Sequence, residues 1–199
     1  MDSHAADPLP VQASTPPTLL DSEPGAFSIL VWHNITIVSW NANATGSTVR
    51  RVAEATVPIA EECRQGFSNI HLVRHGSSLP TAEARAGFVE MADRYSQALA
   101  CVAVGLLGSG FWASALQSAV TGMRMLSPRS FAFRIHNSID AVTAWLPPEH
   151  LKRTGVSVDP DELHSIMTGA FSQTLREADE RAAAERESAS PDRMSARQR

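Results

Sequence analysis

The residues of this sequence that are best suited to chemistry lie in one short stretch, 72–78, which reads LVRHGSS. There an arginine, a histidine and two serines directly follow an apolar run. An imidazole can act as a nucleophile, and a guanidinium binds phosphate oxygens in a planar, bidentate arrangement. The stretch is therefore either a phosphoryl-transfer site or the polar end of an ordinary strand, and the elements around it distinguish the two.

The RHG triplet in this stretch resembles the signature of the histidine phosphatases, where it closes the first strand of the domain. The resemblance implies that His75 takes the phosphoryl group and that His136, in the segment RIHNSI, is the second histidine of the pocket. The arginines that would hold the phosphate are Arg74 and either Arg134 or Arg124.

Three features of the chain count against a phosphatase. Two strand-like runs and a helical pattern precede the triplet, whereas the family has it near the start of the domain. The segment between the two histidines is too short for the family's helical insertion. The general acid that the reaction needs has no candidate in a loop there, because Glu83, Glu90 and Asp93 fall within a helical pattern. We interpret the triplet as a strand end and keep phosphoryl transfer as the alternative.

Composition and charge exclude several classes of protein. With 199 residues, 43% of them hydrophobic and 19% charged, the chain can form one globular domain with tails. Its net charge is −4, and the segment 25–158 carries eleven basic and eight acidic residues, far from the excess of bases that nucleic-acid binding requires. There is no basic, apolar leader and no long apolar run, so we expect a cytoplasmic protein that does not enter a membrane.

The sequence predicts neither a metal site nor a cofactor. Cys63 and Cys101 stand alone in apolar surroundings, which is typical of buried, reduced thiols, and no Cys or His cluster has the spacing of metal ligands. The segment GLLGSGF (105–111) lies between a strand-like run and a helix, where a dinucleotide fingerprint would lie. Its glycines have the wrong order, however, and no acidic residue closes the next strand.

The apolar patterns predict an α/β domain over 25–150. An N-terminal β-hairpin (FSILVW and ITIVSW) is followed by three units of helix and strand and by a final short helix that Pro147 and Pro148 end. The predicted fold is a mixed five-stranded sheet with helices packed on it, in the order ββαβαβαβα. The predicted strands are 27–32, 35–40, 69–74, 98–107 and 131–135, and the predicted helices are 48–66, 81–97, 111–126 and 138–146.

The segments outside this domain have a different character. Residues 1–24 are rich in proline and small polar residues, which predicts a disordered tail. Residues 151–176 contain an appended amphipathic helix with an apolar stripe from Leu163 to Leu175, which packs on its own domain or forms a homodimer. Residues 177–199 are charged on all sides and are predicted to be largely disordered.

This order of elements resembles that of the STAS domains, the fold of the anti-sigma-factor antagonists, over about 125 residues. The segments that carry the likeness are WHNITIVSW, VAVGLLGSGFWASALQSAVTGM and FRIHNSIDAVTAWL. The resemblance implies a non-enzymatic regulatory domain that binds a protein partner, such as a kinase or a sigma-factor regulator, or a small ligand. It also implies a phosphorylatable residue after the third strand, where Ser77, Ser78 and Thr81 stand, although no acidic residue precedes them.

We therefore expect the contact surface at the strand-to-helix loops. In a sheet with parallel crossovers, the loops that leave the carboxyl ends of the strands gather at one edge. The loop 75–81 and the loop 108–112, which contains Gly108, Ser109 and Gly110, should lie there together.

Overall fold

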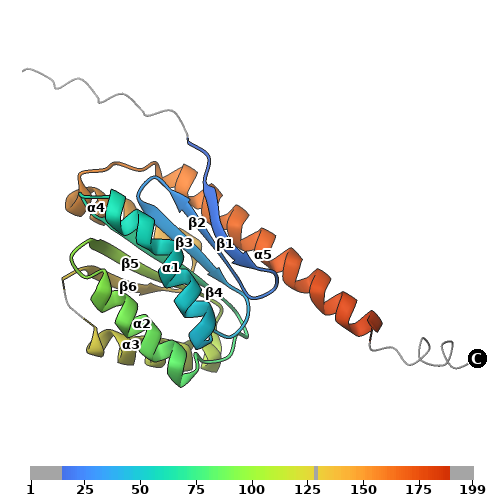
Figure 1. Ribbon diagram of the computed structural model, residues 1–199. Coiled ribbons are helices and arrows are strands. Elements are labelled where there is room, and N and C mark those ends of the chain that lie inside the picture. The colour runs from blue at the N-terminus through green and yellow to red at the C-terminus, as the bar shows by residue number, and fades with distance from the viewer. Residues whose placement is uncertain (1–14, 128–129, 189–199) are drawn as a thin grey trace, which may run out of the picture.

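The computed structural model describes residues 15–127 and 130–188. It is an α/β fold in which one six-stranded mixed sheet lies between two layers of helices (Figure 1). The strands follow each other across the sheet in chain order, from β1 to β6. The predicted α/β class is therefore confirmed and the predicted order of elements approximately matches, but the prediction of five strands is wrong by one.

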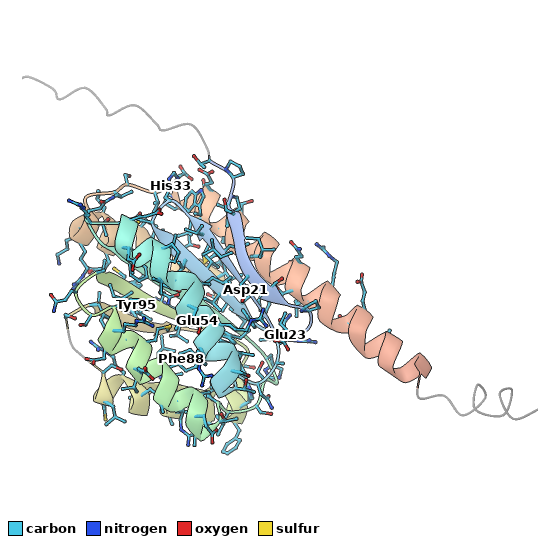
Figure 2. All side chains as sticks on the ribbon, in the orientation of Figure 1. Asp21, Glu23, His33, Glu54, Phe88 and Tyr95 are labelled. Atoms are coloured by element: carbon cyan, nitrogen blue, oxygen red, sulfur yellow. The ribbon has the colours of Figure 1, made fainter. Side chains whose placement is uncertain are left out.

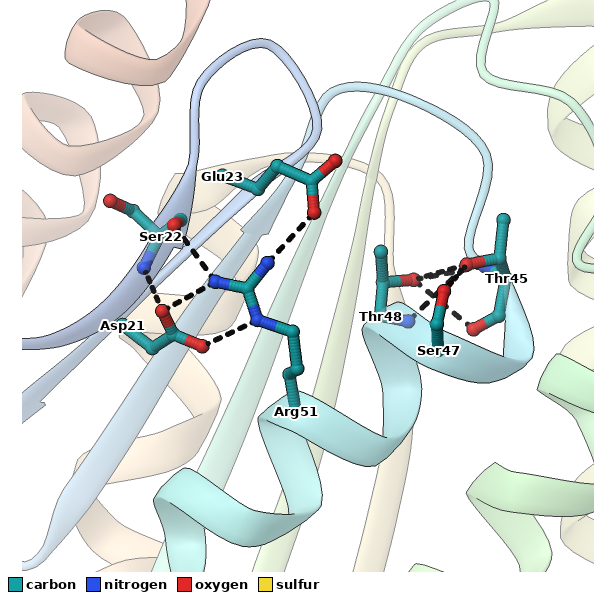
Figure 3. Close-up of polar contacts among 7 residues, drawn as sticks. All are labelled: Asp21, Ser22, Glu23, Thr45, Ser47, Thr48 and Arg51. Atoms are coloured by element: carbon teal, nitrogen blue, oxygen red, sulfur yellow. Dashed lines mark hydrogen bonds and ion pairs between the residues drawn. The ribbon is translucent and has the colours of Figure 1, made fainter.

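The strand that was not predicted is β1 (Thr18–Glu23), which lies in the segment predicted to be a disordered tail. It pairs antiparallel with β2 at the edge of the sheet. Arg51 of the first helix fixes it there: the guanidinium donates to both carboxylate oxygens of Asp21, to Glu23 and to the carbonyl of Ser22 (Figure 3). Pro16, Pro17 and Pro24 flank β1 and make this segment resemble an unstructured tail, although β1 pairs with the next strand in the chain.

The hairpin of β2 (Phe27–Trp32) and β3 (Ile35–Trp40) has the predicted position. His33 in its turn has φ 52°, a conformation that two-residue hairpin turns require. Each later strand is parallel to the one before it: β4 (Phe67–Arg74), β5 (Leu99–Leu107) and β6 (Ala132–His136).

Three helices cover one face of the sheet: α1 (Gly46–Glu62), α2 (Ala82–Arg94) and α3 (Gly110–Leu126). Two cover the other: α4 (Ile139–Thr154) and α5 (Pro160–Ser188). Side chains alternate between the faces along each strand, so Asn69 and His71 of β4 face α1–α3 while Ile70 and Leu72 face α4 and α5.

The two helices of the second face run further than predicted. Pro147 and Pro148 do not end α4, which continues to a left-handed cap at Gly155. Likewise α5 extends to Ser188, well into the segment predicted to be largely disordered. Its apolar stripe packs on its own domain, with Leu163 and Met167 fully buried. Each of the two prolines removes one backbone hydrogen-bond donor from α4, and packing of that helix on the sheet stabilises its remaining turns.

Candidate functional site

The structure brings the two predicted loops together at the carboxyl ends of β4 and β5. Trp112, in the first turn of α3, donates a hydrogen bond from Nε1 to the backbone carbonyl of Ser77 over 2.5 Å. The ring of His75 lies edge-on to the same indole, with 5.0 Å between the ring centroids. Trp112 therefore joins the loop 75–81 to the loop 108–112.

Gly108 makes this contact possible. A Cβ atom at this position would lie 2.3 Å from Nδ1 of His75 and 2.8 Å from Cζ3 of Trp112, which is closer than real Cβ atoms come. Gly76 and Gly110 turn the two loops with φ of 82° and 76°, in the left-handed region that favours glycine. Gly108 and Gly110 of the segment GLLGSGF thus allow the two loops to meet.

The three hydroxyls of the loop 75–81 lie in different surroundings. Ser77 is buried, and its Oγ has no hydrogen-bond partner among the described residues. Ser78 is exposed, and its backbone N–H donates to Oδ1 of Asn43. Thr81 is also exposed, but its hydroxyl caps α2 by accepting a hydrogen bond from the backbone of Ala84. Of the three, Ser78 offers the hydroxyl that is both accessible and free of a structural task.

The residues of the alternative phosphatase site have different neighbours in the structure. His75 is exposed beside Trp112, and Arg74 forms an ion pair with Asp179 of α5 over 3.7 Å. His136 is buried against Trp145 of α4, with 5.3 Å between the ring centroids. Arg134 is exposed on β6. Within 15–127 and 130–188, no hydrogen bond or ring contact joins His75 to the other three residues.

A cavity of about 110 Å³ lies between the sheet and the helices α2 and α3, a feature the sequence analysis did not predict. It runs along β4 and β5, from Trp40 and Ser77 at their carboxyl ends to Phe67 and Leu99 at the other. Its walls are mostly apolar. Phe88 of α2 and Tyr95 at the end of that helix are among them (Figure 2).

Three buried polar side chains interrupt this apolar lining: Asn69, His71 and Ser77. Nδ1 of His71 accepts a hydrogen bond of 3.1 Å from Nε1 of Trp40. Oδ1 of Asn69 has no partner among the described residues. Burial lowers the pKa of His71 to about 4, so the ring is neutral and carries its proton on Nε2. The signal in the sequence is that Asn69 and His71 share one face of a strand whose intervening residues, Ile70 and Leu72, are apolar.

The other face holds a second buried histidine, His150 of α4, whose two ring nitrogens are both occupied. Nε2 donates to Oδ1 of Asn34 over 2.9 Å, and Nδ1 accepts from Oγ of Ser68 over 2.7 Å. Asn34 in turn donates to the carbonyl of Gly66. Burial lowers the pKa of His150 to about 4 as well, because the charged ring would lose its hydration there.

No metal site emerges in the part of the chain that the structure describes: no group of three or more His, Cys, Asp or Glu side chains there could hold an ion. Over the same residues, no helix combines the length and apolar character that crossing a membrane demands. No model of a known protein family matches the chain, and no curated protein matches it.

Proposed function

We propose that the chain is a cytoplasmic, non-enzymatic regulatory domain of the STAS-like kind, which binds a protein partner through the loops 75–81 and 108–112. The observation that supports this proposal best is the contact of Trp112 with both His75 and the Ser77 carbonyl. It makes one continuous surface of two loops that are distant in the sequence.

That surface presents apolar side chains to the solvent. Phe111 is 90% exposed and Leu79 is 48% exposed, and each belongs to one of the two joined loops. A large aromatic side chain held in water by a fixed backbone loses hydration when a partner covers it, and it loses little conformational freedom. The loops thus have the exposed anchor and the rigid support that a protein interface needs.

Phosphorylation of Ser78 is the regulation that this arrangement favours. A phosphate adds close to two negative charges beside the exposed apolar anchors, and it requires no rearrangement of the core. On Ser77 it would have to enter the cavity, and on Thr81 it would disturb the cap of α2. The partners that the STAS resemblance implies are a kinase or a sigma-factor regulator. A homodimer through α5 would have to use the side of that helix that the sheet leaves uncovered.

Site-specific photo-crosslinking in the native cell tests the interface. A photoreactive amino acid at position 111 or 79 should give the same discrete protein adduct. Leu151 is a matched control, because it is 47% exposed on α4. The adduct should be absent at 151 and should diminish in a Ser78→Asp background. Equal adducts at all three positions, or none at 111 and 79, would count against the loops as the interface.

A second measurement separates this function from phosphoryl transfer. The wild type and His75→Ala should both leave p-nitrophenyl phosphate unhydrolysed at the level of a blank. Phosphate release by the wild type that disappears in His75→Ala would establish the phosphatase alternative. Mass spectrometry of the protein from its native cell should find phosphate on Ser78, and consistent absence across growth conditions would contradict the proposed regulation.

A further inference from the structure

The cavity between the sheet and the helices α2 and α3 is too large and too apolar to be explained as a place for one bound water. A water molecule needs roughly 10–15 Å³ of this kind of space and two to four polar partners. The cavity offers about 110 Å³, and most of its lining is aromatic or aliphatic. An apolar cavity of about 150 Å³ in another protein excludes water and binds benzene, so a space of this size and character suits a small organic ring.

The polar groups of the cavity are arranged for a ligand. Asn69 is 3% exposed and Ser77 is 6% exposed, yet neither Oδ1 of the amide nor Oγ of the hydroxyl has a partner among the described residues. Leaving a buried acceptor unpaired lowers the stability of the fold. Apolar residues of similar size would avoid that cost, so both side chains are explained best by a group that binds next to them.

His71 contributes a third directed group. The indole of Trp40 can only donate, so Nδ1 of His71 is the acceptor of their hydrogen bond and the ring proton is on Nε2. No described residue accepts from Nε2. The ring is held between Trp40 and Phe88, with centroid distances of 6.2 Å and 5.7 Å. This N–H is therefore a fixed donor in a cavity whose other polar groups are acceptors or can rotate.

The residues that line the cavity favour one chemical class of ligand. Asn69 and His71 occupy the middle of β4, so hydrogen bonds reach the edge of a ligand halfway along the cavity and not only one of its ends. Trp40, Phe67, Phe88, Tyr95, Phe131 and Phe133 supply aromatic walls. The arginine of the lining, Arg124, lies over the rings of Phe131 and Phe133 at 4.5 Å and 5.5 Å. The buried polar groups are neutral, so they favour a neutral guest over an anion.

We propose that this cavity binds a small neutral aromatic molecule that carries a hydrogen-bonding group on its ring edge, such as an N–H or O–H. The ring lies against the aromatic walls, and the N–H or O–H donates to Oδ1 of Asn69 or to Oγ of Ser77. Where the edge group is a hydroxyl, its oxygen can also accept from Nε2 of His71. This site lies beneath the loop 75–81, and binding of a small molecule there does not depend on whether the loops bind a protein.

Calorimetric titration of the full chain with four probes tests the proposal. Indole and indene have nearly the same shape, but only indole has an N–H. Indole should bind saturably and about tenfold more tightly than indene, since one hydrogen bond to a buried acceptor is worth about a factor of ten. Indole-3-carboxylate and 1-octanol should bind more weakly than indole, because the first is charged and the second is not aromatic.

Substitutions of the lining residues test whether indole binds in this cavity. In Asn69→Leu the preference for indole over indene should disappear, and Ser77→Ala should bind indole more weakly by roughly threefold. Ser39→Ala is the matched control, because Oγ of Ser39 is also buried and has no partner in the described part of the chain, but it lies on the other face of the sheet. It should bind indole like the wild type.

Stability of the ligand-free protein distinguishes a ligand-binding amide from a structural one. Without ligand, Asn69→Leu should unfold at a higher urea concentration than the wild type, because it removes an unpaired buried acceptor. The proposal is overturned by absence of saturable indole binding, by equal affinities for indole and indene, or by tighter binding of the carboxylate or octanol. It is overturned equally by a lower urea midpoint in Asn69→Leu, or by an effect of Ser39→Ala as large as that of Ser77→Ala.

Discussion

The two faces of the sheet bury the same kind of residue in opposite ways. Beneath α4 and α5, both ring nitrogens of His150 have partners in the protein, Asn34 and Ser68. Beneath α1–α3, one nitrogen of His71 bonds to Trp40, while the other nitrogen and the amide oxygen of Asn69 find no partner among the described residues. A closed polar network stabilises a fold, whereas polar groups left open in a cavity are available to a ligand. We name the two faces after these histidines: the face of His150 is the closed face, and the face of His71, next to the joined loops, is the open face.

The largest effect that tests this comparison is a loss of unfolding free energy at acidic pH. His71 and His150 both have a pKa of about 4 in the folded protein, below the ordinary value of 6.5. The unfolded chain therefore binds protons that the folded one does not, so stability is complete above pH 6.5 and falls as the pH drops towards 4. Between pH 8 and pH 5 the two histidines together should cost about 4 kcal/mol of unfolding free energy.

Urea unfolding at a series of pH values measures this loss. As a cross-check, the imidazole nitrogen shifts of both rings should remain those of neutral histidine at pH 5.5 in the folded protein. A free energy of unfolding that stays constant from pH 8 to pH 5 would show that neither ring is buried as described.

The next largest effect is on the closed face. His150→Ala removes both hydrogen bonds and leaves the buried groups of Asn34 and Ser68 unpaired, which should cost about 3 kcal/mol. His164→Ala is the control, because His164 bonds to Asp140 at the surface and its loss should cost at most about 0.5 kcal/mol. Equal losses in urea unfolding would remove the distinction between a network histidine and a surface one.

A smaller effect concerns the joined loops beside the open face. Gly108→Ala forces His75 and Trp112 apart and should cost about 1 kcal/mol, with a change in tryptophan fluorescence. Gly122→Ala in α3 meets no atom within 4 Å and should stabilise the helix by about 0.5–1 kcal/mol. Two variants of one chemical kind should thus shift the urea midpoint in opposite directions. Shifts of the same sign would mean that the loops are not held by this contact.

Local patterns explain which parts of the fold were predictable. The hairpin, the three parallel strands and their helices appear in the sequence because alternation and helical periodicity reflect which side of each element is buried. The extension of α4 past Pro147 and Pro148 was not predictable, because the packing of that helix on the sheet offsets the lost backbone donors. The same holds for β1, which exists through its pairing with β2 and through Arg51.

For the candidate site, the meeting of the loops 75–81 and 108–112 followed from the order of parallel strands alone. The residues that hold the two loops together could not be predicted from that order. The bond from Trp112 to the Ser77 carbonyl spans 35 positions in the chain. The cavity was not predictable either, because it is a space between several elements and the sequence pattern of one element does not describe it.

The sequence by itself determined the class of the fold, the order of its elements and the edge of the sheet where its loops collect, because these depend on periods of a few residues and on the handedness of crossovers. Only the tertiary structure decided which buried polar groups are satisfied. Asn34 and Asn69 are the same residue type in equally buried positions, and what separates them is that a histidine from α4 reaches one and nothing in the described chain reaches the oxygen of the other. Hydrogen-bond satisfaction is a property of distant partners in space, and no local pattern encodes it.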